Sequence, residues 1–114
     1  MRATAFVVVA LLACTFLAGG SPLLAGEVVT VDVKKYKFDP PELTVKVGTT
    51  VRWVNTEKRQ YHSVWFKELD EKEPDYFWPD EVYERTFDTP GVYPYVCEPH
   101  EEDYDMKGVV RVVP

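Results

Sequence analysis

"GVYPYVCEPHEEDYDMKGVVRVV", residues 91–113, contains two strand-like stretches on either side of a charged loop. The stretches GVYPYVC and GVVRVV are rich in β-branched and aromatic residues, which favour strands. Alternate side chains of a strand share one face, so the first stretch ends with Cys97 on the same face as Tyr93 and Tyr95. The loop then adds His100 and Met106. Three side chains that can bind a metal are therefore placed between two adjacent strands.

Alternating stretches elsewhere predict further strands. EVVTVDV and ELTVKV each place three apolar side chains on one face, and VRWVN directs Val51 and Trp53 inward. No segment shows a sustained helical period. The expected strands are residues 27–33, 42–47, 51–55, 62–66, 82–87, 91–97 and 108–113.

The spacing of these strands predicts an all-β fold. Pro40 and Pro41 stop any helix between the first two strands and suit a chain that crosses from one sheet to another. About seven to eight short strands at this spacing are typical of a Greek-key β-sandwich. Residues 67–81 are charged and broken by prolines, so we expect a surface excursion there, with residues 76–78 (Tyr-Phe-Trp) packed on the sandwich rather than exposed.

Composition limits the possible functions. The chain has 114 residues, of which 46% are hydrophobic, so one compact domain with a real core is expected. A formal net charge of -6 argues against nucleic-acid binding, which requires a basic surface. The charged surface is typical of a monomer.

The first 25 residues resemble a secretory signal peptide. An early cation, Arg2, precedes an apolar run and then small residues, and we expect cleavage near Ala25 or Gly26. Gly and Pro interrupt the apolar run too early for a membrane span. A lipoprotein anchored through Cys14 is the less favoured alternative. The expected mature domain is residues 26–114, located in the periplasm.

Cleavage would leave Cys97 as the single cysteine of the exported domain. A disulfide within the domain is then impossible, and a lone thiol in an oxidising compartment needs protection. Metal ligation provides that protection. The chain has only two histidines, and His62 follows the strand VRWVN, whose end can lie at the same pole as the Cys97 loop.

Two imidazoles, a thiolate and a thioether match blue copper better than other metals. Soft sulfur stabilises Cu(I), whereas imidazole tolerates Cu(II). Structural zinc usually has more than one thiolate, and catalytic zinc seldom uses Met. Each residue also has an interpretation without a metal. Cys97 could be a buried core residue, His100 a solvated side chain, His62 a strand-edge residue and Met106 a core-filling residue.

The chain resembles the cupredoxins, the small blue copper proteins, and within them the plastocyanin, pseudoazurin and amicyanin branch. The residues that carry the resemblance are GVYPYVCEPH, MKGVVRVV, FDPPELTVKVGTTVRWVN and HSVWF, and the similarity extends over essentially all of residues 28–114. It implies one copper ion held by His62, Cys97 and His100, with Met106 as axial ligand. It also implies single-electron transfer between redox partners rather than enzymatic turnover. In the family a residue after the VRWVN strand, here Asn55, ties the loop of the first His to the Cys loop.

The loop between His100 and Met106 departs from the family pattern. It has five intervening residues, EEDYD, where the family has four or two. The extra residue either bulges outward or draws Met106 from the metal. The carboxylates of this loop predict docking of a basic partner, such as a cytochrome c, or of an oxidoreductase, through charge attraction. The acidic residues are Glu98, Glu101, Glu102, Asp103 and Asp105.

Two other functions remain open at this stage. One is a copper-binding or copper-delivery protein that does not carry electrons. The other is a red-copper or catalytic site in which an oxygen ligand replaces Met106, with Glu57, Tyr61 and the acidic loop as candidate donors. A binuclear purple copper site needs two cysteines and is excluded for the mature chain.

Overall fold

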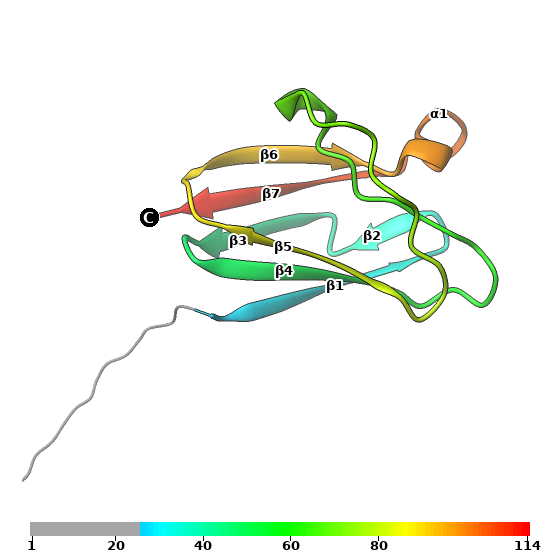
Figure 1. The fold of residues 1–114 in the computed structure, drawn as a ribbon, viewed down its shortest axis with the longest axis horizontal. Helices are drawn as coiled ribbons and strands as arrows, with labels where there is room; N and C mark the ends of the chain where they lie inside the picture. Colours follow the sequence, from blue (N-terminus) through cyan, green and yellow to red (C-terminus); the bar gives the residue numbers. More distant parts are fainter. Residues whose placement is uncertain (1–25) are drawn as a thin grey trace, which may run out of the picture.

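Seven β-strands form two facing sheets in the computed structural model, which describes residues 26–114 (Figure 1). One sheet has the order β2-β1-β4-β5 and the other β3-β7-β6. The pairs β1–β4 and β3–β7 are parallel, and the remaining pairs are antiparallel. The expected all-β sandwich is confirmed. The strands are β1 (Val28–Lys34), β2 (Lys37–Asp39), β3 (Glu42–Lys46), β4 (Thr49–Asn55), β5 (Val82–Phe87), β6 (Gly91–Val96) and β7 (Lys107–Val113).

Helical structure in residues 26–114 is confined to short turns. They are the 3-10 turns η2 (Lys67–Leu69) and η3 (Glu98–His100) and the helix α1 (Glu101–Tyr104). No helix in this range is long and apolar enough to cross a membrane. The predicted signal peptide and the alternative anchor at Cys14 lie outside the described residues.

Aromatic side chains from both sheets fill the space between them. Trp53 of β4 and Phe66 are fully buried, and their ring centroids lie 6.1 Å apart. Tyr95 of β6 reaches across from the other sheet to within 5.3 Å of Trp53 and 4.8 Å of Phe38. Such edge-to-face pairs add to the free energy gained by burying the rings. The β4 side chains expected to point inward, Val51 and Trp53, are both 0% exposed.

The crossing between the sheets occurs where the sequence predicts it. β2 belongs to one sheet and β3 to the other, and Pro40 and Pro41 lie between them. Gly108 of β7 packs against this crossing and against the Tyr95 ring: a Cβ there would collide with the Tyr95 hydroxyl and lie 3.0 Å from the Pro41 carbonyl oxygen. Glycine is required at this close approach.

The expected strand at residues 62–66 is wrong. This segment makes only two isolated bridges, His62 with Phe77 and Trp65 with Val96. The His62–Phe77 bridge has both backbone hydrogen bonds, at 3.1 and 2.8 Å. The segment is therefore bridged to β6 at Trp65 and to the β4–β5 excursion at His62, and the burial of Val64 and Phe66 explains why its pattern resembles a strand.

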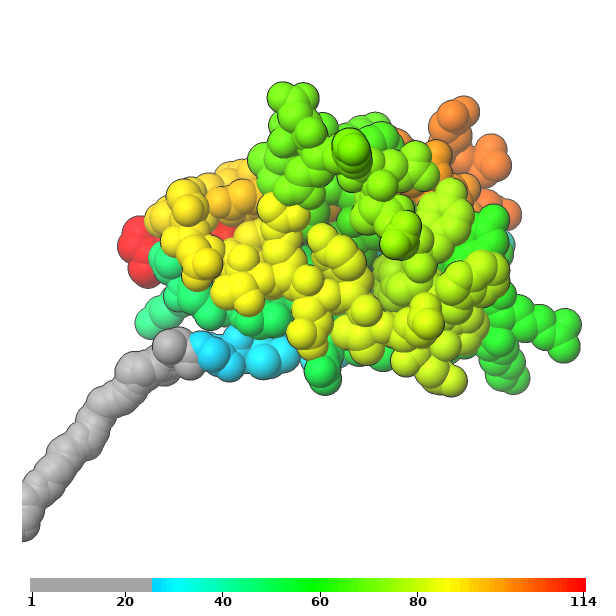
Figure 2. All heavy atoms as spheres, viewed as in Figure 1, coloured from blue at the N-terminus to red at the C-terminus, as the bar shows by residue number. Residues whose placement is uncertain are grey.

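The excursion between β4 and β5 covers part of the face shown in Figure 2, in green to yellow-green, beside β5 in yellow. Of its three consecutive aromatic residues only Phe77 is buried, whereas Tyr76 and Trp78 are 37% and 51% exposed. The expectation that all three pack on the sandwich is thus right for Phe77 alone. Tyr93 forms a tyrosine corner, because its hydroxyl donates to the Thr89 carbonyl oxygen at 2.6 Å.

Candidate metal centre

Three metal-binding side chains converge at one end of the sandwich. The ligand atoms of His62, Cys97 and His100 all lie within 4.8 Å of one another. The Nδ1 atoms of His62 and His100 are 3.6 and 3.3 Å from Cys97 Sγ. All three residues are buried, with exposures of 0%, 0% and 7%. The structure thus brings together three of the four ligands predicted from the sequence in an arrangement that could hold one metal ion.

The backbone after β6 sets the position of Cys97 and His100. Cys97 is the first residue after this strand and precedes η3, which contains Pro99. The His100 N–H donates to the Cys97 carbonyl oxygen at 3.0 Å, so a single turn places the imidazole beside the thiol. The Cys97 N–H in turn donates to the Met106 carbonyl oxygen at 3.0 Å, which closes the loop.

The extra residue in the Met106 loop is accommodated in a helical turn. Residues 101–104 form α1, and Asp105 ends it in a left-handed conformation with φ 51° while its N–H donates to the Glu101 carbonyl oxygen at 2.9 Å. The chain then returns to the core at Met106, whose side chain is 1% exposed and packs among the buried apolar residues. The loop therefore coils outward without exposing Met106 to solvent.

Glu57 fixes the orientation of His62. Its Oε2 lies 3.0 Å from His62 Nε2 and accepts the Lys35 backbone N–H at 2.7 Å. A carboxylate can only accept, so Nε2 of the neutral imidazole carries the proton. The Nδ1 lone pair is then directed toward Cys97 and is free to bind a metal. Such outer hydrogen bonds commonly orient histidine ligands.

Ser63, rather than Asn55, joins the loops of His62 and Cys97. The Ser63 N–H donates to Cys97 Sγ at 3.3 Å, and the Ser63 hydroxyl accepts the Glu98 N–H at 2.9 Å. The expectation that Asn55 makes this link is wrong.

Asn55 bonds to residues of the β4–β5 excursion instead of to the Cys97 loop. Its amide donates to the carbonyl oxygens of Gln60 and Phe77 at 2.9 and 3.0 Å, and its side-chain oxygen accepts the Glu57 N–H at 2.9 Å. Asn55 thus shapes the loop that holds Glu57 and His62. Sequence reasoning missed Ser63 altogether and treated Glu57 as a candidate ligand. The one available signal was the position of Ser63 directly after His62.

Burial controls the protonation of the thiol. Removal from water raises the pKa of Cys97 to about 11, only partly offset by hydrogen bonds from Ser63 and His100. A metal cation stabilises the thiolate that burial disfavours, and metal binding therefore displaces the proton. The buried thiol beside two imidazole nitrogens fits a soft metal with an affinity for both sulfur and nitrogen, of which copper is one.

Lowering the pH below about 6.5 is expected to destabilise the metal-free protein. Burial lowers the pKa of His62, and burial together with the nearby His62 lowers the pKa of His100. In the unfolded chain both imidazoles take up protons near pH 6.5, and the folded state does not until a lower pH. The free energy of unfolding should fall by up to about 1.4 kcal/mol per pH unit for each histidine.

Urea unfolding of the metal-free protein between pH 8 and pH 5 tests this expectation. A double variant, His62→Gln with His100→Gln, should show a smaller fall over the same range. An equal fall in both proteins would assign the pH dependence to other groups.

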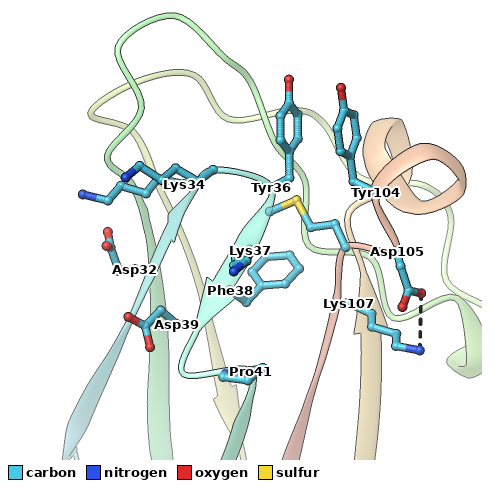
Figure 3. A pocket seen from close by; sticks show the side chains of 12 residues that line it. Asp32, Lys34, Tyr36, Lys37, Phe38, Asp39, Pro41, Tyr104, Asp105 and Lys107 are labelled. Carbon is cyan, nitrogen blue, oxygen red and sulfur yellow. Dashed lines mark ion pairs between the residues drawn. The ribbon is translucent and has the colours of Figure 1, made fainter.

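Tyrosines surround His100. Tyr36 lies edge-on to its ring at 4.9 Å, Tyr61 lies at 6.0 Å and Tyr104 of α1 at 5.9 Å between centroids. Tyr36 and Tyr104 are stacked on one another at 3.6 Å with parallel rings, as Figure 3 shows. An aromatic rim therefore separates His100 from bulk solvent.

Several carboxylates near His100 form ion pairs or hydrogen bonds. Glu101 pairs with Lys67 at 2.7 Å, and Asp105 pairs with Lys107 at 3.3 Å. Glu98 accepts the Tyr76 hydroxyl at 2.9 Å, a contact that raises the pKa of Tyr76 to about 12. Glu102 and Asp103 make no ion pair among residues 26–114, and both are exposed. The negative rim expected from the sequence is thus reduced by two ion pairs.

Comparisons with known proteins point to one family. A family model described as copper binding proteins of the plastocyanin/azurin family matches residues 25–113. The chain is 37% identical to amicyanin-alpha of Methylorubrum extorquens, over 98% of this chain and 99% of that protein. It is 40% identical to the plastocyanin of Scenedesmus fuscus, over 66% of this chain and 85% of that one. The crystal structure of amicyanin from Paracoccus versutus matches with a TM-score of 0.65 at 33% identity, covering 79% of this chain and 85% of that chain.

Proposed function

Because this chain belongs to the plastocyanin/azurin family of copper-binding proteins, we propose that it carries single electrons between redox partners in the periplasm. Proteins of this family are electron carriers rather than enzymes, and copper is the cofactor. In this proposal His62, Cys97 and His100 would hold one copper ion, and Met106, the axial ligand that the family resemblance implies, would supply a sulfur. The observation that carries the proposal is the convergence of the two Nδ1 atoms on Cys97 Sγ in a buried pocket.

The protein's own residues would keep this site rigid. Copper supplies a centre that alternates between Cu(II) and Cu(I) when bound. Glu57 holds the His62 ring through Nε2, and Ser63 donates to Cys97 Sγ. Rigid outer contacts reduce the rearrangement that accompanies a change of charge.

Substitution of Met106 is expected to alter the spectrum of the copper-loaded protein. The unmodified protein should show an intense visible thiolate-to-copper band and a narrow copper hyperfine splitting. A Met106→Gln variant should shift both, because an amide oxygen would replace the weak axial thioether. Visible absorption and EPR of the two proteins, each loaded with Cu(II), are the measurements.

A different Cu(II) spectrum would favour one of the two alternative functions, copper binding without electron transfer or a site without the Met106 sulfur. A wide hyperfine splitting in the unmodified protein would favour a copper-binding or copper-delivery protein, and a chelator would then remove copper rapidly. A spectrum unaffected by Met106→Gln would favour a site without the axial sulfur. Glu57 is a weak candidate to replace Met106, because its Oε2 contacts Nε2 of His62 rather than the face that points to Cys97.

The partner at the His100 end is proposed to be basic, a cytochrome c or an oxidoreductase with a positive docking face. Glu102 and Asp103 of α1 have no ion pair within residues 26–114, and they support this proposal because they lie beside the rim of His100. Charge attraction raises association rates at low ionic strength and loses its effect when salt screens it.

Removal of these two charges is expected to slow association with a basic cytochrome c. A Glu102→Gln, Asp103→Asn variant should associate about threefold to tenfold more slowly at low ionic strength and at the normal rate in high salt. The matched control is Glu27→Gln, Asp88→Asn, which removes two exposed carboxylates far from α1 in sequence. Stopped-flow reduction rates measure the effect, and equal slowing in both variants would show that only net charge matters.

The domain boundary is also proposed. Residues 1–25 are taken as a signal peptide, and the domain of residues 26–114 as the exported form. The family match, which begins at residue 25, supports this division. Intact-mass measurement of the exported protein decides: a chain starting near Gly26 lacks Cys14, whereas an acylated Cys14 would add the mass of its lipid.

A further inference from the structure

The cations of this acidic protein are distributed unevenly. Of the 13 Lys and Arg residues, Arg2 lies outside the described range and five others form ion pairs with carboxylates. Seven have no ion pair within residues 26–114, and five of those seven lie on two adjoining segments. This basic cluster consists of Lys34, Lys35, Lys37, Lys58 and Arg59. The other two are Lys46 and Lys72.

The basic cluster lines two hollows in the surface that share Lys34 and Lys35. Lys34 and Lys35, at the turn between β1 and β2, share a hollow of about 490 Å³ with Lys58 and Arg59 of the loop after β4. The same two lysines also line an adjoining hollow of about 540 Å³, together with Lys37. Figure 3 shows Lys34 and Lys37 on the hairpin that carries Tyr36. All five cations are exposed.

Nearby carboxylates offset part of the charge of the cluster, but none forms an ion pair with its cations among residues 26–114. Asp32 accepts the Thr56 hydroxyl at 2.6 Å, and Glu57 contacts His62 and the Lys35 backbone N–H. Asp39 lines the same hollow as Lys37, so the five cations outnumber three carboxylates. The protein has 19 acidic residues and 13 basic ones, so the number of carboxylates would allow every cation a partner. Five like charges at one place repel one another, and they attract an oppositely charged surface.

The backbone holds the cluster close to the metal centre. Lys35 and Tyr36 form a two-residue hairpin turn with φ of 56° and 59°, a conformation that usually requires Asn or Gly. This strained turn directs the Lys35 N–H to Glu57, which contacts His62. The same turn places Tyr36 against His100. Two hydrogen bonds therefore connect the basic cluster to a candidate ligand.

We propose that the basic cluster is the docking surface for a second redox partner, a protein whose own docking face is acidic. The proposal rests on the proposed function as an electron carrier. Figure 1 shows the β1–β2 turn, the loop after β4 and α1 at the same end of the molecule. Tyr36 of the basic hairpin stacks on Tyr104 of the acidic helix, so the two charged surfaces meet at the aromatic rim.

Opposite charges on the two surfaces would direct the electron donor and the electron acceptor to different docking sites. A basic partner is attracted by Glu102 and Asp103 and repelled by the basic cluster, and an acidic partner experiences the reverse. Like-charge contacts of this kind suppress the wrong partner as effectively as attraction selects the right one. A carrier that must meet two different proteins thereby avoids non-productive docking.

Binding to an acidic protein of known structure tests this proposal. The probe is an acidic [2Fe–2S] ferredoxin, titrated at low ionic strength into ¹⁵N-labelled, copper-loaded, reduced protein. Amide shifts should change at residues 34–37 and 56–60. A Lys58→Glu, Arg59→Glu variant should bind at least about tenfold more weakly. The matched control, Lys46→Glu with Lys72→Glu, has the same charge change outside the cluster and should lose less than about threefold.

Three outcomes would overturn the proposal. Equal weakening in both double variants would show that net charge alone is responsible. Amide shifts confined to α1 would place docking elsewhere. Binding to phosphatidylserine vesicles but not to the ferredoxin would assign the cluster to a membrane surface. The readout is binding, so it does not depend on electron transfer, and a failed copper spectrum would contradict the proposed function separately.

Discussion

A Cys97→Ser variant is expected to lose the intense visible band of the Cu(II) protein completely. The band requires a thiolate bound to copper, and Cys97 is the only cysteine in residues 26–114. A serine hydroxyl keeps its proton far above neutral pH and is a poor ligand for copper, so the affinity for copper should also fall sharply. Visible absorption of both proteins after loading with Cu(II), with copper content measured by atomic absorption, provides the test.

The fold of the metal-free Cys97→Ser variant should remain intact. Ser63 N–H and the two imidazole nitrogens surround the position and can bond a hydroxyl as well as a thiol. The loss of stability should therefore be about 1 kcal/mol. Ser63→Ala is the companion variant, because it removes the hydroxyl that accepts the Glu98 N–H but keeps every proposed ligand. Retention of the band in Cys97→Ser would mean that the thiolate does not bind the metal.

A Trp53→Ala variant is expected to lose about 3–5 kcal/mol of unfolding free energy, a large share of the total for a domain of this size. Trp53 is fully buried and its ring contacts Phe66, Tyr83 and Tyr95, so truncation leaves a cavity bounded by other rigid rings. Urea unfolding of the metal-free proteins, followed by circular dichroism, measures the change.

Two further tryptophan variants control this measurement. Trp53→Phe should cost much less, because it keeps a ring in the core and removes an indole N–H that has no hydrogen-bond partner among residues 26–114. Trp78→Ala truncates a half-exposed side chain and should change stability by less than about 1 kcal/mol. Similar losses for Trp53→Ala and Trp78→Ala would contradict the assignment of Trp53 to the centre of the core.

The strands were predictable because one face of each sheet is buried. Val31 and Val33 of β1 and Val51 of β4 are all 0% exposed, and their two-residue spacing is visible in the sequence. Residues 62–66 show the limit of this signal. Val64 and Phe66 alternate as strand residues do, yet the backbone of this segment forms β-bridges only at His62 and Trp65. Sequence periodicity therefore indicates which side chains are buried, but it does not indicate whether the backbone pairs with a neighbouring strand.

The ligands were more predictable than the residues that hold them. Cys97, His100 and Met106 are close in sequence, and the choice of His62 followed from there being no other histidine. The roles of Ser63 and Glu57 depend on how two loops approach one another, which no local pattern reveals. Asn55 was assigned the contact that Ser63 makes, because Asn55 ends the strand that leads into the His62 loop and only the geometry of that loop distinguishes the two residues.

The pairing of β7 determines when the second sheet can form. β7 is the central strand of this sheet, and it is the only strand paired with β3 and β6 in residues 26–114. Until β7 has paired, β3 and β6 have no strand partner in their own sheet. Such pairing between distant parts of the chain makes folding slow. The folding chain therefore presents its thiol and imidazoles before the second sheet exists, and selective capture of a metal must follow the pairing of β7.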